Sequence, residues 1–323
     1  MTMHRRLEAA LRGAFCLTIA GWAMTQPAHA GLTLNATGLS LGFSLSTYAS
    51  GGGYYGHFAA SALPDGTIVA VDLPNGRLLK YSDSDGQTHG SALATQALAG
   101  ARNVAKVNGH TYAVSTSGYF EVGSDLGLTP IAVGLTPTWG LWGNPVTGHL
   151  LSGTTTGLYS VNPLTGSATF IVNPVALDGV SVSKDGTIVY AALENSGVSA
   201  YSIATGTQIF HKPIAGLPGG TGVVMDGALE GHIVAVNHDG TVGLIDPTGA
   251  TYQTIATGGA RGEVASVDLN NGTLFLTFDE QMYRLSLAGG DFGTEAIPEP
   301  GSMLLLAAAV TGIGAIRRRT RRT

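Results

Sequence analysis

Residues 185–206, DGTIVYAALENSGVSAYSIATG, contain three glycine turns that separate short apolar runs. Asp185-Gly186, Ser196-Gly197 and Thr205-Gly206 favour tight turns, because glycine adopts a positive φ without steric cost. The runs between them are rich in β-branched and aromatic residues, which favour β-strands. Strands that are joined in pairs by such turns predict a small antiparallel sheet.

The same arrangement recurs along the chain with a nearly constant period. The first turn of the unit occurs six times, and its successive glycines are 43, 39, 38, 45 and 41 residues apart. The six first turns are Asp65-Gly66, Asn108-Gly109, Thr147-Gly148, Asp185-Gly186, Glu230-Gly231 and Asn271-Gly272. A second and a third turn follow in each unit, but the sixth unit has Asp279-Glu280-Gln281 in place of its second glycine turn. Three turns define four short strands in each unit.

A period near 41 residues with four strands is typical of a β-propeller blade. A single blade cannot bury both faces of its sheet, so the units must stack around a ring. We therefore expect an all-β, six-bladed β-propeller over residues 56–297. A β-solenoid is the alternative, but its repeats are usually shorter, and a β-sandwich requires no fixed period.

Two stretches within the repeats show a common pattern. Residues 158–166, LYSVNPLTG, and residues 197–206, GVSAYSIATG, place leucine or tyrosine in the third strand before a Thr-Gly turn. In this respect the repeats resemble the YVTN, NHL and gluconolactonase-like propellers. The resemblance covers most of residues 56–297 and concerns architecture, because no catalytic set of these families is identifiable in the chain.

Residues 31–55 precede the first repeat and are too short for a seventh blade. Leu32–Thr47 is strand-like, with Thr37-Gly38 as a turn. We expect a closing strand that pairs the last blade with the first, which would remove two exposed sheet edges. A capping hairpin is the alternative. Gly51-Gly52-Gly53 is not followed by the lysine of a phosphate-binding loop and predicts a linker into the first blade.

The C-terminus carries three signals in succession. Pro298-Glu299-Pro300 is followed by the 14-residue apolar run Met303–Ile316 and then by five arginines. As a helix this run covers roughly 21 Å, less than the ~30 Å of a bilayer core. The order resembles the PEP-CTERM sorting domain of exopolysaccharide-producing Gram-negative bacteria, over residues 297–323. The resemblance implies recognition of Pro298, Glu299 and Pro300 by an exosortase, transient membrane insertion, and removal of the tail. A weakly anchored tail helix is the alternative.

The N-terminus has the three parts of a secretory signal peptide. Arginines within the first 12 residues precede the apolar core Gly13–Met24, and Ala28-His29-Ala30 is a small-x-small site. We expect export by the Sec translocase and cleavage between Ala30 and Gly31; an uncleaved anchor is the alternative. Together the two ends predict a protein of the cell surface or extracellular matrix that is exported across the inner membrane.

Removing both tails makes the remaining chain strongly acidic. Eight of the 16 basic residues and two of the 21 acidic residues lie in the tails, so residues 31–297 carry a net charge of −11. This charge disfavours nucleic acid as a partner, because binding there depends on neutralising phosphates with Lys and Arg. The single cysteine, Cys16, leaves with the signal peptide, so the remaining body has no disulfide, thiolate nucleophile or cysteine metal site.

Candidate binding residues gather where the innermost strand of each predicted blade begins. We call this side of the ring the start face and the opposite side the end face. The start-face candidates are His57, Arg102, Asn103, Trp139, Asp178, Thr221, Arg261 and Glu263. Trp139 could stack on a sugar, and Arg102 or Arg261 could bind it through paired hydrogen bonds. The alternative is that these groups satisfy one another and the water of the channel.

The remaining histidines and acidic pairs do not predict a metal site. His110, His149 and His232 occupy equivalent positions in different blades, so they are expected to lie apart around the ring, whereas ligands must lie about 2.0–2.1 Å from one ion. Asp83-Ser84-Asp85-Gly86 begins like a calcium loop but lacks its distal carboxylate, which favours a turn. His89 and His238 are expected to be isolated and solvated.

The sequence thus favours a protein that acts by binding or scaffolding, with extracellular polysaccharide or a surface protein as partner, and without a cofactor. The alternative is a propeller enzyme of lactonase or lyase type. That enzyme would use Asp178 and Glu263, with Ca²⁺ or another divalent ion. A structural spacer is the third interpretation.

Overall fold

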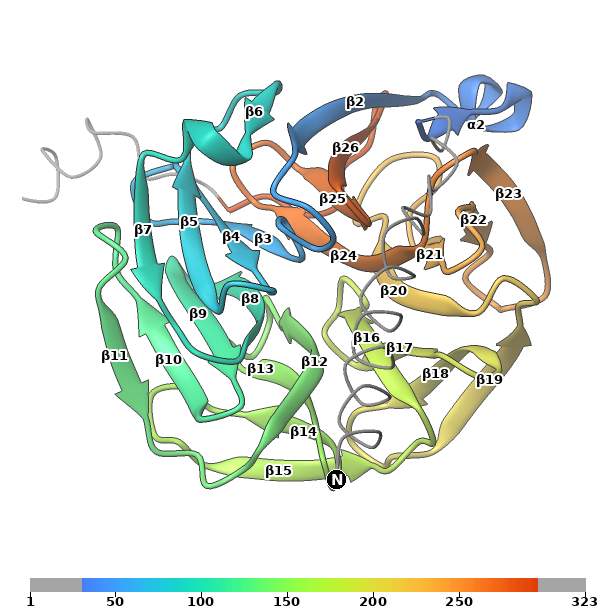
Figure 1. Ribbon diagram of the computed structural model, residues 1–323. Helices are drawn as coiled ribbons and strands as arrows, with labels where there is room; N and C mark the ends of the chain where they lie inside the picture. Colours follow the sequence, from blue (N-terminus) through green and yellow to red (C-terminus); the bar gives the residue numbers. More distant parts are fainter. Residues whose placement is uncertain (1–30, 296–323) are drawn as a thin grey trace, which may run out of the picture. The chain divides into compact units, whose positions relative to one another are not determined.

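Six small antiparallel sheets form a ring in the computed structural model, which describes residues 31–295 (Figure 1). The expected all-β, six-bladed propeller is confirmed. The predicted signal peptide up to Ala30, the motif Pro298, Glu299 and Pro300, and the apolar run lie outside the described residues. Within residues 31–295, no helix has the length and apolar character that crossing a membrane requires.

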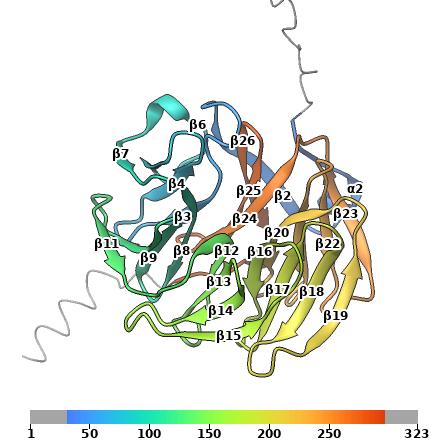
Figure 2. The same ribbon diagram turned by 60° about the horizontal axis from the view of Figure 1, so that its bottom comes forward.

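Each blade has four strands that lie side by side, and their order in the sheet leads outward from the central axis (Figure 2). The innermost strands are β3 (Ala60–Ala62), β8 (Ala101–Val107), β12 (Pro137–Gly143), β16 (Leu177–Val182), β20 (Pro218–Val223) and β24 (Gly262–Asp268). The second strands are β4 (Ile68–Asp72), β9 (His110–Ser115), β13 (Leu150–Thr154), β17 (Ile188–Leu193), β21 (Ile233–Asn237) and β25 (Thr273–Phe278). The third strands are β5 (Arg77–Tyr81), β10 (Gly118–Val122), β14 (Gly157–Val161), β18 (Gly197–Ser202), β22 (Val242–Ile245) and β26 (Gln281–Leu287).

The outermost strands reveal how the ring closes. In the first five blades they are β7 (Ala94–Ala97), β11 (Leu128–Ile131), β15 (Ala168–Val172), β19 (Gln208–Pro213) and β23 (Tyr252–Thr257). The sixth blade takes its outermost strand, β2 (Phe43–Ser50), from the N-terminal segment, where it pairs antiparallel with β26 (Figure 1). β2 also pairs in parallel with β6 (Gln87–Thr88), a two-residue strand in the connection between β5 and β7 of the first blade. The N-terminal segment therefore joins the last blade to the first.

The start of the N-terminal segment differs from the expected turn. A short helix, α2 (Ala36–Ser40), occupies the Thr37-Gly38 position, because the Asn35 side chain accepts a hydrogen bond from Gly38 N at 2.9 Å and caps the helix. Asn35 Nδ2 also donates to Thr254 O at 2.8 Å. The preceding strand β1 (Thr33–Leu34) extends the fifth blade by pairing with β23. The other described helix is the single 3₁₀ turn His89–Ser91.

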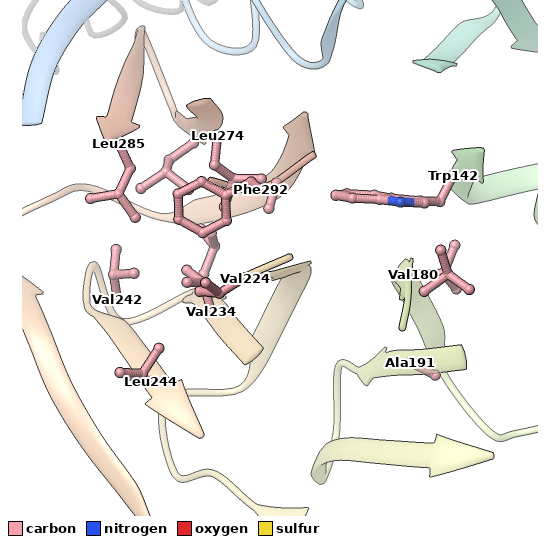
Figure 3. Close-up of a cluster of buried hydrophobic side chains, with 14 of the residues drawn as sticks. Trp142, Val180, Ala191, Val224, Val234, Val242, Leu244, Leu274, Leu285 and Phe292 are labelled. Carbon is pink, nitrogen blue, oxygen red and sulfur yellow. The ribbon is translucent and has the colours of Figure 1, made fainter. Parts of the chain in front are cut away.

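Buried apolar side chains from successive blades form the contacts between the sheets. One cluster extends over the third to sixth blades, and Figure 3 shows Trp142 and Val180 in one group and Leu274 and Val224 in another. Phe292, which follows the last strand, lies among the latter residues and is fully buried. The core therefore lies between the blades, as stacking of incomplete sheets requires.

Close approach of the innermost strands requires glycine at several positions. A Cβ on Gly220 of β20 would lie 2.4 Å from Ala265 N of β24, and one on Gly179 of β16 would lie 2.6 Å from Gly219 O. These obstacles are backbone atoms, which cannot move aside as a flexible side chain can. The absence of a side chain therefore sets the spacing of the blades at the axis.

We predict that Gly220→Ala destabilises the ring by about 1–3 kcal/mol, the usual cost of overpacking. Gly90→Ala is the matched control, because no atom lies within 4 Å of its added Cβ and its φ is not positive. The control should be neutral or gain up to about 1 kcal/mol from a less flexible unfolded state. Urea unfolding of both variants measures the difference, and equal stabilities would contradict close packing at Gly220.

Candidate functional site

Irregular strand pairing shapes the start face of the ring. In five blades the pairing of the innermost strand with the second strand shifts register near the first residues of the innermost strand. The shifts fall at Ala101/Asn103, Pro137/Leu141, Leu177/Val180, Pro218/Gly220 and Gly262/Ala265. Bulges of this kind re-aim side chains and are common beside functional sites. Four sequence candidates, Arg102, Trp139, Asp178 and Glu263, lie within these irregular stretches.

Asp178 and Glu263 come together with a histidine at the start face. Oδ2 of Asp178 lies 3.8 Å from His238 Nε2, and Oε2 of Glu263 lies 3.5 Å from the same nitrogen. One donor atom from each residue lies within 4.8 Å of the other two. All three side chains are about nine-tenths buried. The topology thus gathers two carboxylates and an imidazole in a largely water-excluded place.

Further polar groups surround Glu263 on its open side. Arg261 Nε forms an ion pair with Glu263 Oε1, and the Tyr55 hydroxyl donates a hydrogen bond to the same oxygen. Arg261 Nη2 also lies 3.3 Å from Glu194 Oε1 and 3.4 Å from His238 Nε2. Arg261 and Glu194 are each more than two-fifths exposed, so they form the solvent-facing edge of the cluster.

The two carboxyl groups have opposite electrostatic environments. Burial, followed by the charges of Glu263 and Glu194, raises the pKa of Asp178 well above its usual value. Burial also acts to raise the pKa of Glu263, but the contacts with His238 and Tyr55 and the charge of Arg261 hold it below its usual value. Among residues 31–295 no side chain donates a hydrogen bond to Asp178, so its negative charge lacks the compensation that Glu263 receives.

His238 was wrongly expected to be solvated. It directly follows β21, and His238 N donates to Leu217 O at 3.0 Å, which holds the turn between β21 and β22 against the loop that leads into β20. The sequence interpretation considered only loops that lead into innermost strands. Turns between second and third strands lie at the same face, and this topological rule could have identified His238. Glu194, which follows β17, was missed for the same reason, whereas Tyr55 lies in the loop before β3 that was interpreted as a linker.

A second group of candidates lies beside this cluster and is already engaged. The guanidinium of Arg102 lies over the Trp139 ring, 4.5 Å from its centroid, and Phe58 contacts that ring edge-on at 5.5 Å. Asn103 Nδ2 donates to Trp139 O at 2.5 Å. Trp139 therefore has a cation on one face, and the open aromatic platform expected for sugar stacking is not available there.

Two of the remaining candidates are buried and form hydrogen bonds inside the fold. His57 Nε2 contacts the Tyr81 hydroxyl at 2.9 Å, away from the carboxylate cluster, and burial lowers the pKa of His57 to about 4. Thr221 is fully buried, accepts a hydrogen bond from Ser181 at 2.9 Å and donates to Tyr190 O at 3.3 Å. Neither residue lies with Asp178 and Glu263.

The other histidines are distributed through the blades. His110, His149 and His232 contact Glu121, Ser160 and Leu229 O respectively, which agrees with their expected separation. His89 is not solvated as expected. Its Nε2 lies 3.0 Å from the buried carboxylate of Asp72, and Arg77 pairs with the same carboxylate at 2.6 Å.

The stretch that begins like a calcium loop takes part in ring closure. Arg284 of β26 pairs with Asp83 and, at 3.1 Å each, with Asp85 and with Asp268 of β24. Burial and the nearby charge of Asp83 raise the pKa of Asp268 to about 7. The two aspartates of the loop thus bind an arginine of the sixth blade.

The end face contains a cavity of about 340 Å³, at the opposite ends of the innermost strands from Asp178 and Glu263. It is lined by the ends of innermost strands and by residues 291–295, including Lys106, Trp142, Met225 and Phe292. Its lysines are paired, Lys106 with Glu295 at 3.4 Å and Lys184 with Glu230 at 2.9 Å. We therefore place the candidate chemistry at the start face, where a buried carboxylate lacks compensation.

Comparison with known proteins supports both parts of the sequence interpretation. The PEP-CTERM protein-sorting motif matches residues 296–322. No curated protein matches the chain. A gluconolactonase from Xanthomonas campestris superposes with a TM-score of 0.61 at 13% identity, covering 80% of this chain and 95% of its own. Regucalcin, a calcium-binding protein from Agrobacterium tumefaciens, superposes with a TM-score of 0.56 at 15% identity, covering 77% and 97%.

Such low identities show a shared fold and leave the chemistry to the residues of this chain. The sorting motif implies an exported protein. The chain is a six-bladed β-propeller, similar to propellers of the gluconolactonase and regucalcin type, that carries a PEP-CTERM sorting motif at its C-terminus.

Proposed function

We propose that the chain is an exported, metal-dependent propeller hydrolase that acts on lactones or related esters of hydroxy acids. The observation that carries the proposal is the buried trio of Asp178, His238 and Glu263. A buried carboxylate with no compensating hydrogen bond is costly, and a bound cation is one of the few ways to offset that cost. The sorting motif and predicted signal peptide support export by Sec, processing by an exosortase, and residence at the cell surface or in the matrix.

The donor spacing suits a small divalent ion. Two donors that each lie about 2.1 Å from a tetrahedral ion are about 3.4 Å apart. The His238 nitrogen lies 3.5 Å from Glu263 and 3.8 Å from Asp178, so the residues fit such an ion with small adjustments. An imidazole donor favours Zn²⁺ or Mn²⁺ over Ca²⁺, which takes oxygen ligands.

The surrounding residues have definable roles in this proposal. Arg261 and the Tyr55 hydroxyl hold Oε1 of Glu263, which leaves Oε2 directed toward His238. Burial and the hydrogen bond to Glu263 raise the pKa of Tyr55, so Tyr55 remains a donor at neutral pH. The exposed edge of Arg261 can bind a carbonyl or carboxylate oxygen of a substrate. When bound, a divalent ion supplies Lewis-acid polarisation of a carbonyl and acidifies water.

Binding without catalysis is the competing function. The sequence favoured it because the chain carries a sorting tail and no recognisable catalytic motif, and Trp139 was the candidate for stacking on a sugar. The cation over the Trp139 ring counts against this use, since Arg102 would have to leave before a sugar could take its place. Asp178, by contrast, is a convergent carboxylate that receives no hydrogen bond from the part of the chain that the structure describes, which is the feature expected of the enzyme.

We expect Zn²⁺ or Mn²⁺ at 100 times its Kd to stabilise the protein by about 2.7 kcal/mol. Asp178→Asn should weaken metal affinity at least about 10–100-fold, and it should raise metal-free stability at neutral pH because it removes a buried charge. Glu280→Gln, an exposed change of the same kind, is the control. Isothermal titration and thermal melts of the three proteins measure both effects. Equal metal response of Asp178→Asn and the wild type would overturn the proposed ligand set.

The raised pKa of Asp178 predicts how the stability of the metal-free protein depends on pH. Its folded pKa lies above its unfolded value, near 3.9, so its stabilising contribution is complete below that value and is lost as pH rises through the folded pKa. Metal-free wild type should therefore lose stability relative to Asp178→Asn as pH rises through this window. Metal affinity should increase over the same window. Urea unfolding in EDTA across pH tests the sign, and a pH-independent difference would contradict it.

Catalysis is tested with the metal-loaded protein and a panel of sugar-acid lactones, including gluconolactone. We expect metal-dependent acid release in a pH-stat, and a fall of about 10–100-fold in kcat/KM for His238→Ala, as for other losses of metal-site partners. His110→Ala, which removes an exposed histidine of another blade, should leave the rate unchanged. Tight metal binding with no hydrolysis across the panel would instead favour the binding propeller.

A further inference from the structure

The last described residues, Asp291–Glu295, are fixed across the end face of the ring, and we call them the C-terminal clamp. Met225 N of the fifth blade donates to Asp291 O at 2.7 Å. Phe292 N donates to Gly272 O at 2.9 Å, and Glu295 N donates to Leu269 O at 3.1 Å, both in the sixth blade. The backbone of the clamp is therefore held by two blades.

Side chains of the clamp extend this attachment. Phe292 is fully buried among apolar side chains of the fifth and sixth blades, such as Val224 and Leu274 (Figure 3). The Glu295 carboxylate accepts hydrogen bonds from Gly109 N at 3.1 and 3.2 Å and pairs with Lys106 at 3.4 Å, both in the second blade. The clamp thus leads from the fifth and sixth blades to a second-blade turn on the end face.

The sorting signal begins immediately after this clamp. The matched motif starts at residue 296, and Pro298 is three residues beyond Glu295. A fully extended chain spans at most about 3.5 Å per residue, so Pro298 lies within about 10 Å of Glu295. The apolar run starts at Met303, eight residues beyond Glu295, and so within about 28 Å.

Residues 296–302 link the clamp to the apolar run, and we call them the tether. The tether is too short to bring the start face to the bilayer. The innermost strand β24 has seven residues, and at about 3.3 Å per residue the ring is at least about 20 Å tall there. A tether that reached the other face would have to cross the rest of the end face and then the full height of a blade. Residues 296–302 cannot do both.

We infer that the end face is the surface that the protein presents to the lipid bilayer while its sorting tail is in the membrane. The start face, with Asp178, His238 and Glu263, then points away from the bilayer and toward solutes. This orientation does not depend on the proposed metal or hydrolase activity, because it follows from the clamp and the tail alone.

The exposed charges of the end face do not attract it to a lipid bilayer. Asp226 and Glu230 lie beside a single lysine, Lys184, and all three are at least half exposed. Anionic lipids attract basic clusters, and this acidic group offers no such attraction. The tether therefore holds the end face at the bilayer, and removal of the tail releases it.

Single-cysteine labels can test the orientation, because the chain without its signal peptide contains no cysteine. The uncleaved protein is exported in a host without an exosortase and reconstituted in vesicles whose headgroups carry a nitroxide quencher. Asp226→Cys labels the end face, and Val175→Cys labels the loop before Asp178; the native side chains are 68% and 83% exposed. We expect severalfold stronger fluorescence quenching at position 226 than at position 175.

A flexible insertion tests whether the short tether is the cause of the orientation at the bilayer. Twenty Gly and Ser residues between Glu295 and Ala296 add an average span of about 25 Å, which should bring quenching at position 226 down to the level at position 175. Equal or stronger quenching at position 175 in the native-length chain would overturn the orientation. Unchanged quenching at position 226 after the insertion would overturn the tether as its cause.

Discussion

The structure depends on the crowding of six innermost strands around one axis. Backbone atoms of adjacent strands come so close that Gly140, Gly179, Gly219 and Gly220 leave no space for a Cβ. The same strands lose regular pairing with their second strands at the start face. Close packing and broken pairing occur in the same residues, so the centre of the ring is both tightly fixed and irregular. Polar side chains in these stretches, above all Asp178 and Glu263, are directed by that irregularity.

The repeat could be predicted because each turn has a local cause. Gly66, Gly186 and Gly206 have positive φ, and such positions recur wherever a blade reverses direction. The closing strand was expected because residues 31–55 are too short for a seventh blade, but no local signal gives the register of β2 against β26, since that pairing joins opposite ends of the domain. The helix at Ala36–Ser40 was missed since a single cap, Asn35, decided a segment whose composition suits a strand.

The candidate site was predictable in part for the same reason. Asp178 and Glu263 sit at equivalent points of two repeats, so the period alone places them on one face. His238 comes from a different kind of turn, and only the three-dimensional path of the chain brings it to them. The opposite pKa shifts of the two carboxyl groups are also a property of the assembled ring. Arg261 precedes Glu263 by two residues and compensates it, whereas nothing near Asp178 in the sequence does so.

The pairing of β2 with β26 has a consequence for how the protein folds after export. Phe43 pairs with Leu287, a contact between residues 244 positions apart. Contacts of such long range make folding slow, because the chain between them must be ordered first. Export from the N-terminus, which the predicted signal peptide implies, would leave β2 without its partner β26 until the end of the domain has crossed, and an unpaired edge is prone to aggregation. On that route, closure of the ring would occur when little more than the sorting tail remains to cross.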